Sequence, residues 1–172
     1  PPALLHRYPL TMEHSRTILL WPFSLIYGLI TGIRNFMYNN GLLKSNEFGI
    51  PLICVGNLAA GGTGKTHHTE YLAALLRKEF NVAVLSRGYK RKSRGFRFAD
   101  SSSTSAGIGD EPLQISRKFP GISVAVDGNS VRGITKILAE KPSTGVIILD
   151  DGYQHRRVKP GFAILLTAYD RL

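Results

Sequence analysis

Cysteine is almost missing from this sequence, since Cys54 is the only one among 172 residues. A single thiol excludes an internal disulfide and agrees with a reducing compartment. Cys54 lies inside an apolar run, so we expect it to be buried and inert. The five histidines have no metal-like spacing to one another or to the cysteine, so the sequence gives no indication of a zinc site.

Acidic residues are also scarce. There are 12 aspartates and glutamates against 22 lysines and arginines, which gives a formal net charge of +10. A charge of this size implies a negatively charged partner. Nucleic acid, anionic lipid headgroups and phosphorylated substrates all remain open at this level.

Internal repeats are absent, and the only compositional bias is a serine-rich run at residues 101–105, which predicts an exposed loop. A hydrophobic fraction of 43% is enough for a sizeable core, and the length allows one domain or one domain with an appendage. The chain begins with Pro1-Pro2 and ends at Leu172 just after an apolar run, so both ends look cut. Residues 1–16 are expected to form an N-terminal extension.

Charged residues are absent from positions 17–33, which lie between Arg16 and Arg34. This length is the lower limit for crossing a bilayer, and the segment contains Pro22. Aromatic residues with flanking arginines suit the headgroup boundary. We therefore predict a membrane-associated helix over residues 17–38 and favour one that lies in the interface, while a spanning helix and a buried core helix remain open. No small-residue cleavage site follows, which excludes a cleaved signal peptide.

Residues 50–80 show the order of apolar strand, glycine-rich turn and helix that a phosphate-binding loop requires. The glycines let the backbone curl so that successive N–H groups face one anion at the helix N-terminus. Lys65 is expected to reach the β- and γ-phosphates, and the Thr66 hydroxyl to bind Mg²⁺. The usual pattern has glycine at position 59. The predicted nucleotide-binding residues are Ala59, Ala60, Gly61, Gly62, Thr63, Gly64, Lys65 and Thr66.

Apolar runs and helical patterns alternate through the rest of the chain. Strands are predicted at residues 50–55, 82–85, 122–126, 146–149 and 162–166, and helices at 65–80, 112–118 and 130–140. This alternation indicates an α/β fold of P-loop NTPase type, with a mostly parallel sheet and helices on both faces. The helix after the loop should bury a face made of Leu72, Leu75, Leu76 and Phe80.

Asp150 and Asp151 follow the apolar strand at residues 146–149. A carboxylate at the C-terminal end of a buried parallel strand is where a P-loop fold holds its second Mg²⁺ contact. A helix cap or a turn would also explain Asp-Asp-Gly, but the Gly-Lys-Thr sequence upstream favours Mg²⁺ for Asp150. Asp151 could bind a metal-bound water or have a structural role.

A second acidic pair, Asp110 and Glu111, stands before Pro112 at the start of a short predicted helix. N-capping by Asp110 is one explanation, since aspartate caps well and proline suits the first turn. The functional interpretation is a base that takes the proton from an attacking hydroxyl. Spacing alone does not separate the two.

Two basic clusters follow the ends of predicted strands, where ligands bind in open α/β sheets. In the first cluster, Arg87 and Tyr89 are candidates for substrate contact, whereas residues 90–92 are expected to be solvated. The second cluster comprises Gln154, His155, Arg156 and Arg157.

In combination, these motifs closely resemble the tetraacyldisaccharide 4′-kinase family, the lipid A kinases of Gram-negative bacteria. Order and spacing agree over residues 18–172, and the region from Pro22 to Asn35 resembles the membrane-proximal helix of the family. The chain is therefore divided into a membrane-associated helix at 17–38 and a P-loop kinase domain at 48–172, truncated at its C-terminus. The matching elements are Val55-Gly56-Asn57, Gly61-Gly62-Thr63-Gly64-Lys65-Thr66, Ser86-Arg87-Gly88-Tyr89, Gly109-Asp110-Glu111-Pro112, Val124-Ala125-Val126-Asp127 and Asp150-Asp151-Gly152-Tyr153-Gln154-His155-Arg156.

The resemblance implies transfer of the ATP γ-phosphate to the 4′-hydroxyl of a tetraacyldisaccharide 1-phosphate, with Mg²⁺ as cofactor. It places the enzyme at the cytoplasmic face of the inner membrane, with the lipid precursor and the membrane surface as partners and no nucleic acid. It implies that Asp110 is the general base and that Lys65 acts on the nucleotide. The implied Mg²⁺-side residues are Thr66, Glu111, Asp150 and Asp151, and the implied substrate contacts are Arg87, Tyr89, Gln154, His155 and Arg156.

The chain departs from the family at three points. His67 stands where proline is usual, and Ser130 stands where arginine is common. Members of the family run to roughly twice this length and supply an Asp-His element from their second half. We therefore expect this chain to hold the nucleotide site without the complete catalytic complement.

Rival interpretations have less support. A membrane-associated P-loop ATPase with a regulatory or transport role is the main alternative, but a partitioning ATPase would need lysine where Ala60 stands. A targeting GTPase would need a base-reading Lys-x-Asp motif, whereas Lys136 is followed by Ile137 and Leu138. A nucleic-acid binder would rest on the net charge alone.

Overall fold

The computed structural model describes residues 13–57, 64–150 and 156–167. The chain divides into two compact units, Pro1–Lys44 and Ser45–Leu172.

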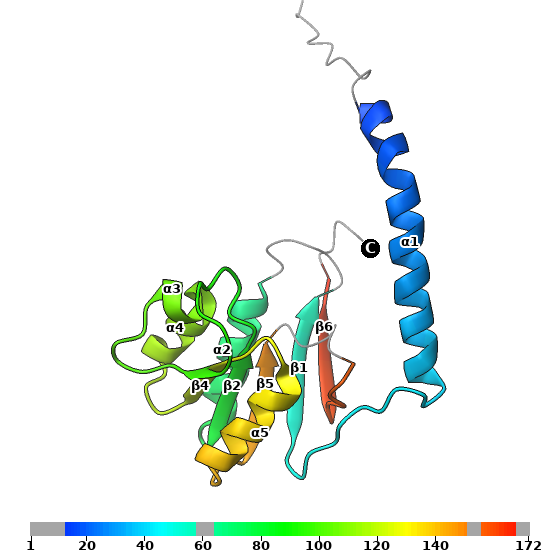
Figure 1. Cartoon of the computed structure of the whole chain (residues 1–172). Helices are drawn as coiled ribbons and strands as arrows, with labels where there is room; N and C mark the ends of the chain where they lie inside the picture. Colours follow the sequence, from blue (N-terminus) through cyan, green and yellow to red (C-terminus); the bar gives the residue numbers. More distant parts are fainter. Residues whose placement is uncertain (1–12, 58–63, 151–155, 168–172) are drawn as a thin grey trace, which may run out of the picture. The chain divides into compact units, whose positions relative to one another are not determined.

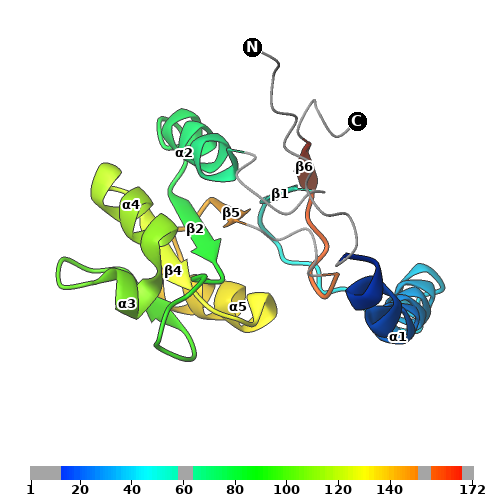
Figure 2. The same cartoon turned by 90° about the horizontal axis from the view of Figure 1, so that it is seen from above.

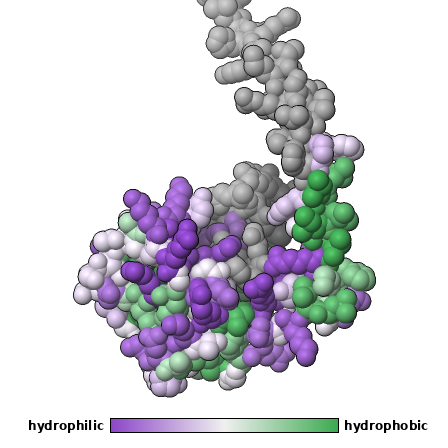
Figure 3. Space-filling model, viewed as in Figure 1, coloured by the Kyte–Doolittle hydropathy of each residue, from purple (hydrophilic) through white to green (hydrophobic). Residues whose placement is uncertain are grey.

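The first unit contains one long helix, α1 (Glu13–Asn39), which includes Pro22. Its large apolar side chains are exposed, with Trp21 at 67% and Leu29 at 64%. They form an apolar strip that is visible in green in Figure 3. Residues at spacings of three and four lie on the same face of a helix, so Trp21, Leu25, Leu29 and Ile33 share one face. Among the described residues, no helix combines the length and the apolarity needed to cross a bilayer.

The second unit is built on a six-stranded sheet of order β3-β4-β2-β5-β1-β6 (Figure 1). All neighbouring strands pair in parallel except β3, which is antiparallel to β4. The mostly parallel α/β architecture predicted from the sequence is therefore confirmed. The strands are β1 (Leu52–Asn57), β2 (Val82–Ser86), β3 (Arg97–Phe98), β4 (Ser123–Val126), β5 (Val146–Asp150) and β6 (Phe162–Leu166).

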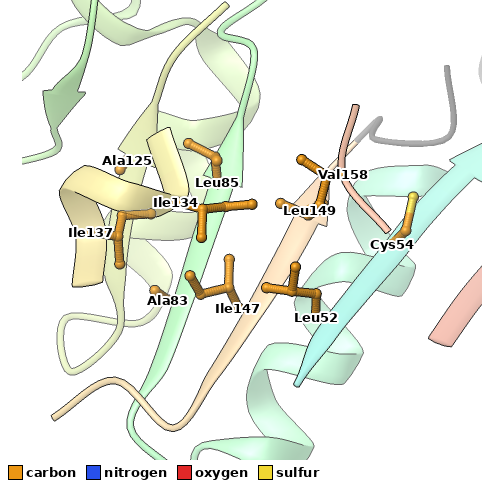
Figure 4. Packing of buried hydrophobic residues seen from close by; sticks show 10 residues of the cluster. All are labelled: Leu52, Cys54, Ala83, Leu85, Ala125, Ile134, Ile137, Ile147, Leu149 and Val158. Carbon is orange, nitrogen blue, oxygen red and sulfur yellow. The ribbon is translucent and has the colours of Figure 1, made fainter. Parts of the chain in front are cut away.

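Helices cover both faces of this sheet, as Figure 2 shows, with α2 and α4 on one face and α5 on the other. Alternate residues of each strand point to opposite faces, so the sheet supports two separate hydrophobic clusters. Ile134 and Ile137 of α5 complete one cluster (Figure 4), and Ala73 of α2 and Ile115 of α4 complete the other. The helices are α2 (Lys65–Leu76), α3 (Ser105–Ile108), α4 (Asp110–Lys118) and α5 (Ser130–Glu140).

The buried face of α2 differs from the sequence prediction. The helix ends at Leu76 and not at Phe80, and both Leu75 and Phe80 are exposed. The buried residues are Thr69, Glu70 and Ala73, which place a hydroxyl and a carboxylate against the interior. These polar groups can be buried because each has a hydrogen-bonding partner on another element.

Two short elements were not predicted, the two-residue strand β3 and the four-residue helix α3. Cys54 is buried in β1, as its apolar surroundings predicted.

Helix α5 approaches strand β2 closely at Gly133, and this contact yields a stability prediction. A Cβ atom at position 133 would lie 2.7 Å from Leu85 Cδ2 and 3.2 Å from Asp127 Cβ. Leu85 is itself buried, so its methyl groups cannot move away without disturbing the core. Gly133→Ala should therefore lower the free energy of unfolding by about 1–3 kcal/mol despite the gain in helix propensity.

Urea unfolding of both proteins measures this effect. Gly121→Ala is the matched control, because a Cβ atom at Gly121 would meet nothing within 4 Å. A Gly133→Ala protein as stable as the control would show that the core around Leu85 accommodates the added methyl group without cost.

Candidate active site

The carboxyl ends of β1, β2 and β5 lie at one edge of the sheet, because these strands run parallel. Val55 is in register with Asp150, and Leu85 with Leu149. Helices α2 and α4 each run back from this edge before the next strand begins, so their N-termini point toward it (Figure 1). Ligands bind at this edge in open α/β sheets.

Helix α2 begins directly after Gly64, whose φ of 75° lies in the left-handed region. Glycine adopts this conformation without steric cost, which allows the sharp change of direction from loop to helix. No side chain caps the helix, and the carbonyl of Gly64 accepts the N–H of His68 at 3.2 Å. Lys65 and Thr66 therefore stand at a helix N-terminus whose first N–H groups can bind an anion.

Several predicted site residues lie outside the described part of the chain. For the phosphate-binding loop, the structure describes Gly64, Lys65 and Thr66. The predicted residues that it does not describe are Ala59, Ala60, Gly61, Gly62, Thr63, Asp151, Gln154 and His155.

Asp150 is the last residue of β5 and is almost completely buried, with 3% of its surface exposed. The hydroxyl of Thr69, in α2, donates a hydrogen bond of 3.1 Å to Oδ1 of Asp150. Thr69 lies three residues after Thr66, so this bond holds the carboxylate against the first turns of α2. The predicted partners of Mg²⁺, Thr66 and Asp150, are thus placed on adjoining elements.

The chemistry of these donors fits Mg²⁺. Thr66 and Asp150 offer oxygen ligands, which this ion prefers, and Mg²⁺ is typically held by one or two protein carboxylates together with substrate phosphates and water. No group of three or more His, Cys, Asp or Glu side chains gathers into a metal site among the described residues. Glu111 is therefore not joined to Asp150 in such a cluster.

Asp110 and Glu111 are exposed in the first turn of α4. The N-cap position belongs to Gly109, with φ 96° and ψ 159°, and no side chain makes a capping hydrogen bond. N-capping by Asp110, one of the two sequence interpretations, is therefore wrong. The structure leaves the Asp110 carboxylate exposed at the start of the helix.

The turn before Asp110 packs directly on the turn that follows β2. A Cβ atom at Gly109 would lie 3.1 Å from the carbonyl oxygen of Tyr89 and 3.2 Å from Gly88. Further along, Lys92 N–H donates to Ala106 O at 2.8 Å. The structure thus brings the backbone next to Asp110 against the segment that carries Arg87 and Tyr89, both of which are exposed.

Residues 90–92 are not uniformly solvated, contrary to the sequence prediction. Lys90 and Lys92 are exposed, but Arg91 is half-buried and donates a hydrogen bond of 2.7 Å to the carbonyl of Gly95. Arg156, from the second basic cluster, is half-buried, and its carbonyl accepts a hydrogen bond from the Ser45 hydroxyl.

Glu70 joins α2 to α4 and was missed by the sequence analysis. Its carboxylate is 5% exposed and accepts hydrogen bonds of 2.7 Å from Gln114 and from Lys118. Glu70 lies one helical turn after Thr66, and Gln114 lies one turn after Asp110. The pairing therefore aligns the two helix starts that carry Thr66 and Asp110. An acidic residue on the buried face of α2 was the only signal in the sequence.

Burial raises the pKa of Glu70, but the hydrogen bonds from Lys118 and Gln114, together with the positive charges of Lys118 and His67, hold the pKa below its ordinary value. Glu70 therefore contributes stability that is complete above the ordinary carboxyl pKa of about 4.3 and is lost as the pH falls through the lower folded-state pKa.

Lys118→Met tests this arrangement. The substitution removes one partner of a buried carboxylate and should lower the free energy of unfolding by about 1–2 kcal/mol at pH 7. The difference from the wild type should shrink as the pH falls through the lowered pKa of Glu70 and its carboxylate becomes protonated. Denaturant unfolding at pH 7 and at an acidic pH provides the measurement. The control is Lys78→Met, because Lys78 is exposed and follows the end of α2. A deficit that stays constant with pH would contradict the role given to Glu70.

A mostly parallel sheet, with the glycine-preceded start of α2 beside a buried carboxylate at a strand end, is typical of an α/β protein of P-loop kinase type. Comparison with known families makes the assignment specific. The family described as Tetraacyldisaccharide-1-P 4′-kinase (LpxK) matches residues 16–172. The chain belongs to this family.

Similarity to individual proteins of the family supports this assignment. The chain is 56% identical over 154 residues to the tetraacyldisaccharide 4′-kinase of Flavobacterium johnsoniae, covering 90% of this chain and 45% of that protein. It is also 56% identical over 154 residues to the corresponding kinase of Bacteroides thetaiotaomicron, covering 89% of this chain and 40% of the relative. The chain thus spans less than half the length of these relatives.

A solved structure shows the same fold. The crystal structure of "apo" form LpxK from Aquifex aeolicus in complex with ATP superposes with a TM-score of 0.77 at 42% identity. The match covers 85% of this chain and 47% of that one.

Proposed function

We propose that this chain supplies the nucleotide-binding half of a kinase that transfers the γ-phosphate of ATP to the 4′-hydroxyl of a tetraacyldisaccharide 1-phosphate. The observation that carries the proposal is the alignment of α2 and α4 at the carboxyl edge of the sheet, beside the buried Asp150. Membership of the kinase family supports phosphoryl transfer as the reaction, and the related Aquifex aeolicus structure, which is in complex with ATP, supports ATP as the nucleotide.

The proposed nucleotide site consists of the loop 59–66. Lys65 would place its ammonium group on the β- and γ-phosphates, and the helix N-terminus would add backbone N–H groups. Thr66 and Asp150 would hold Mg²⁺, with Glu111 and Asp151 on the same side. When bound, Mg²⁺ neutralises charge on the phosphates.

Asp110 is the proposed general base. It is exposed, it makes no capping bond, and the Glu70–Gln114 contact aligns its helix with α2. It would accept the proton of the acceptor hydroxyl as that oxygen attacks the γ-phosphorus. The proposed contacts to the acceptor are Arg87, Tyr89, Gln154, His155 and Arg156.

Two substitutions in a full-length protein that carries this chain test the reaction. Asp110→Asn should lower kcat by about 10²- to 10⁴-fold, because it removes a general base, while the affinity for ATP is retained. Lys65→Ala should weaken ATP binding as well as turnover. Transfer of labelled γ-phosphate to the lipid and direct titration of the nucleotide separate these effects.

Glu140→Gln is the control, since Glu140 is exposed at the far end of α5. Wild-type turnover by Asp110→Asn, with an unchanged pH profile, would refute the assignment of the base.

We also propose that α1 holds the protein on the cytoplasmic face of the inner membrane by lying in the interface. Its exposed apolar face, continuous from Trp21 to Phe36, supports this placement. An interfacial helix would bring the site to a substrate that carries acyl chains.

Leu25→Glu with Leu29→Glu should release the protein from anionic vesicles, because charge on the apolar face opposes insertion. Ser24→Glu with Thr31→Glu adds the same charge to the opposite face and should leave most of the binding intact. Co-sedimentation with vesicles gives the comparison. Equal loss in both variants would show that electrostatic attraction, and not the apolar face, holds α1.

A further inference from the structure

Asp110, the proposed base, has no anchor of its own in the described part of the chain. Its carboxylate is exposed and forms no ion pair or hydrogen bond with another described side chain. The start of α4 is also uncapped, because Gly109 offers no side chain at the N-cap position. The position of the Asp110 carboxylate therefore depends on how α4 itself is held.

Glu70 of α2 holds α4 at two points. Its Oε1 atom accepts a hydrogen bond of 2.7 Å from the side-chain amide of Gln114, and its Oε2 atom accepts one of 2.7 Å from the ammonium group of Lys118. The Glu70 carboxylate is buried, so water competes little for these bonds. The two donors are one helical turn apart on α4, and Gln114 is the one nearer to its start.

The two helices carry their site residues on the faces that meet at this contact. Residues four apart share one face of a helix, so Asp110 lies on the same face of α4 as Gln114. In the same way, Thr66 lies on the face of α2 that carries Glu70. Both helices run from the carboxyl edge of the sheet and cover the same face of it (Figure 2). Thr66 and Asp110 therefore form the next level of this contact, about 6 Å along each axis toward the edge.

The opposite ends of α2 and α4 are joined by a different contact. The guanidinium carbon of Arg77, at the C-cap of α2, lies 5.2 Å from the centre of the Phe119 ring, at the C-cap of α4. This cation–π contact is more than two helical turns from Asp110. Among the polar contacts that the structure describes between these helices, the one from Gln114 to Glu70 is thus nearest to the site.

We propose that Glu70 and Gln114 are positioning residues for phosphoryl transfer, whose hydrogen bond sets the separation between the start of α2 and the base on α4. This inference rests on the proposed kinase reaction. A base accepts a proton only within hydrogen-bond reach, and a misplacement of about 1 Å can lower a rate about a hundredfold. Each of the two residues acts through the backbone of its own helix, since the Glu70 carboxylate is taken up by α4.

Gln114→Ala in the full-length protein tests this role. Gln114 is exposed and alanine favours helix, so the variant should fold, and Lys118 still pairs with the buried Glu70. We expect kcat for phosphorylation of the lipid to fall about ten- to a hundredfold. KM for ATP should stay the same, because the start of α2 is unchanged. Arg117→Ala is the matched control, an exposed residue of α4 that should keep the wild-type kcat.

Lys118→Met provides a control for stability. It also removes one donor from Glu70, but two helical turns from Asp110, so kcat should fall less than in Gln114→Ala. A merely structural role of the contact predicts equal losses of kcat in the two variants. Equal losses would therefore overturn the proposal, and so would a kcat of Gln114→Ala that matches Arg117→Ala.

An exchange of the two side chains tests whether the hydrogen bond itself matters. Gln114→Glu alone places two carboxylates in contact and should lower kcat. Combined with Glu70→Gln, it restores one amide donor and one carboxylate acceptor in reversed order, so most of the wild-type kcat should return. A double variant no better than Gln114→Glu alone would refute the positioning role.

The pH profile separates positioning from loss of the base. Gln114→Ala keeps Asp110, so its residual turnover should follow the wild-type pH profile, whereas that of Asp110→Asn should not. A fall in ATP affinity that parallels the fall in kcat of Gln114→Ala would overturn the proposal, because α2 itself would then be displaced.

Amide hydrogen exchange gives a readout that does not need the reaction. In Gln114→Ala, the first turn of α4 should exchange faster than in the wild type, while α2, which Thr69 also ties to Asp150, should exchange as before. This result in a protein that transfers no phosphate to the lipid would refute the kinase reaction and leave the link between the helices standing. Wild-type exchange in α4 would overturn the link itself.

Discussion

The parallel pairing of β2, β5 and β1 is the constraint on which the rest of the second unit depends. These strands form two ladders with β5 in the centre, and β2 and β5 are buried at every position. When both faces of a sheet are covered, polar residues are confined to the strand ends and the turns that follow them. That restriction explains why Asp150, Asp127 and the Arg-Gly-Tyr turn all stand at strand ends.

Polar burial on α2 is the second feature that shapes the site. A helix packed on a sheet usually presents an apolar stripe, whereas α2 buries Thr69 and Glu70 beside Ala73. Each polar group is satisfied by one on another element, Thr69 by Asp150 and Glu70 by Gln114 and Lys118. Buried hydrogen bonds of this kind add little net stability, but an orphaned partner is costly. They therefore fix the rotation of α2, and with it the direction of Lys65 and Thr66.

Much of the fold could be predicted because its strands are continuous apolar runs. The runs at residues 146–149 and 162–166 appear as β5 and β6 with ends that agree within one residue, and the helix at 130–140 appears as α5. The strand β3 could not be predicted, since two residues carry no periodicity and Arg97–Phe98 is extended only because it pairs with β4. The prediction of the buried face of α2 was wrong for a similar reason. Its rotation is set by Asp150 and Lys118, which are distant in sequence.

The candidate site likewise has parts that the sequence predicts and parts that it does not. A motif with fixed local spacing, such as Gly64-Lys65-Thr66, can be recognised within one segment, and its position at the start of α2 follows directly. The sequence left two interpretations of Asp110 open, an N-cap and a general base. The structure excludes the first, because Gly109 and not Asp110 occupies the N-cap. Arg132 illustrates what no local pattern could show, because it lines the same pocket as arginines from the segment after β2.

The distribution of positive charge follows from these constraints. A kinase acting on an acceptor that is already phosphorylated must bind two anionic groups and keep them apart, since like charges at close range repel. The sheet provides the separation, because β5 lies between β1 and β2. Lys65 stands at the start of α2, in the segment after β1, and Arg87, Arg91 and Arg94 follow the end of β2. The start of α4 carries Asp110, a carboxylate that forms no ion pair within the described residues. A general base must remain free to accept a proton, so the exposed position of Asp110 in the first turn of α4 suits the role proposed for it.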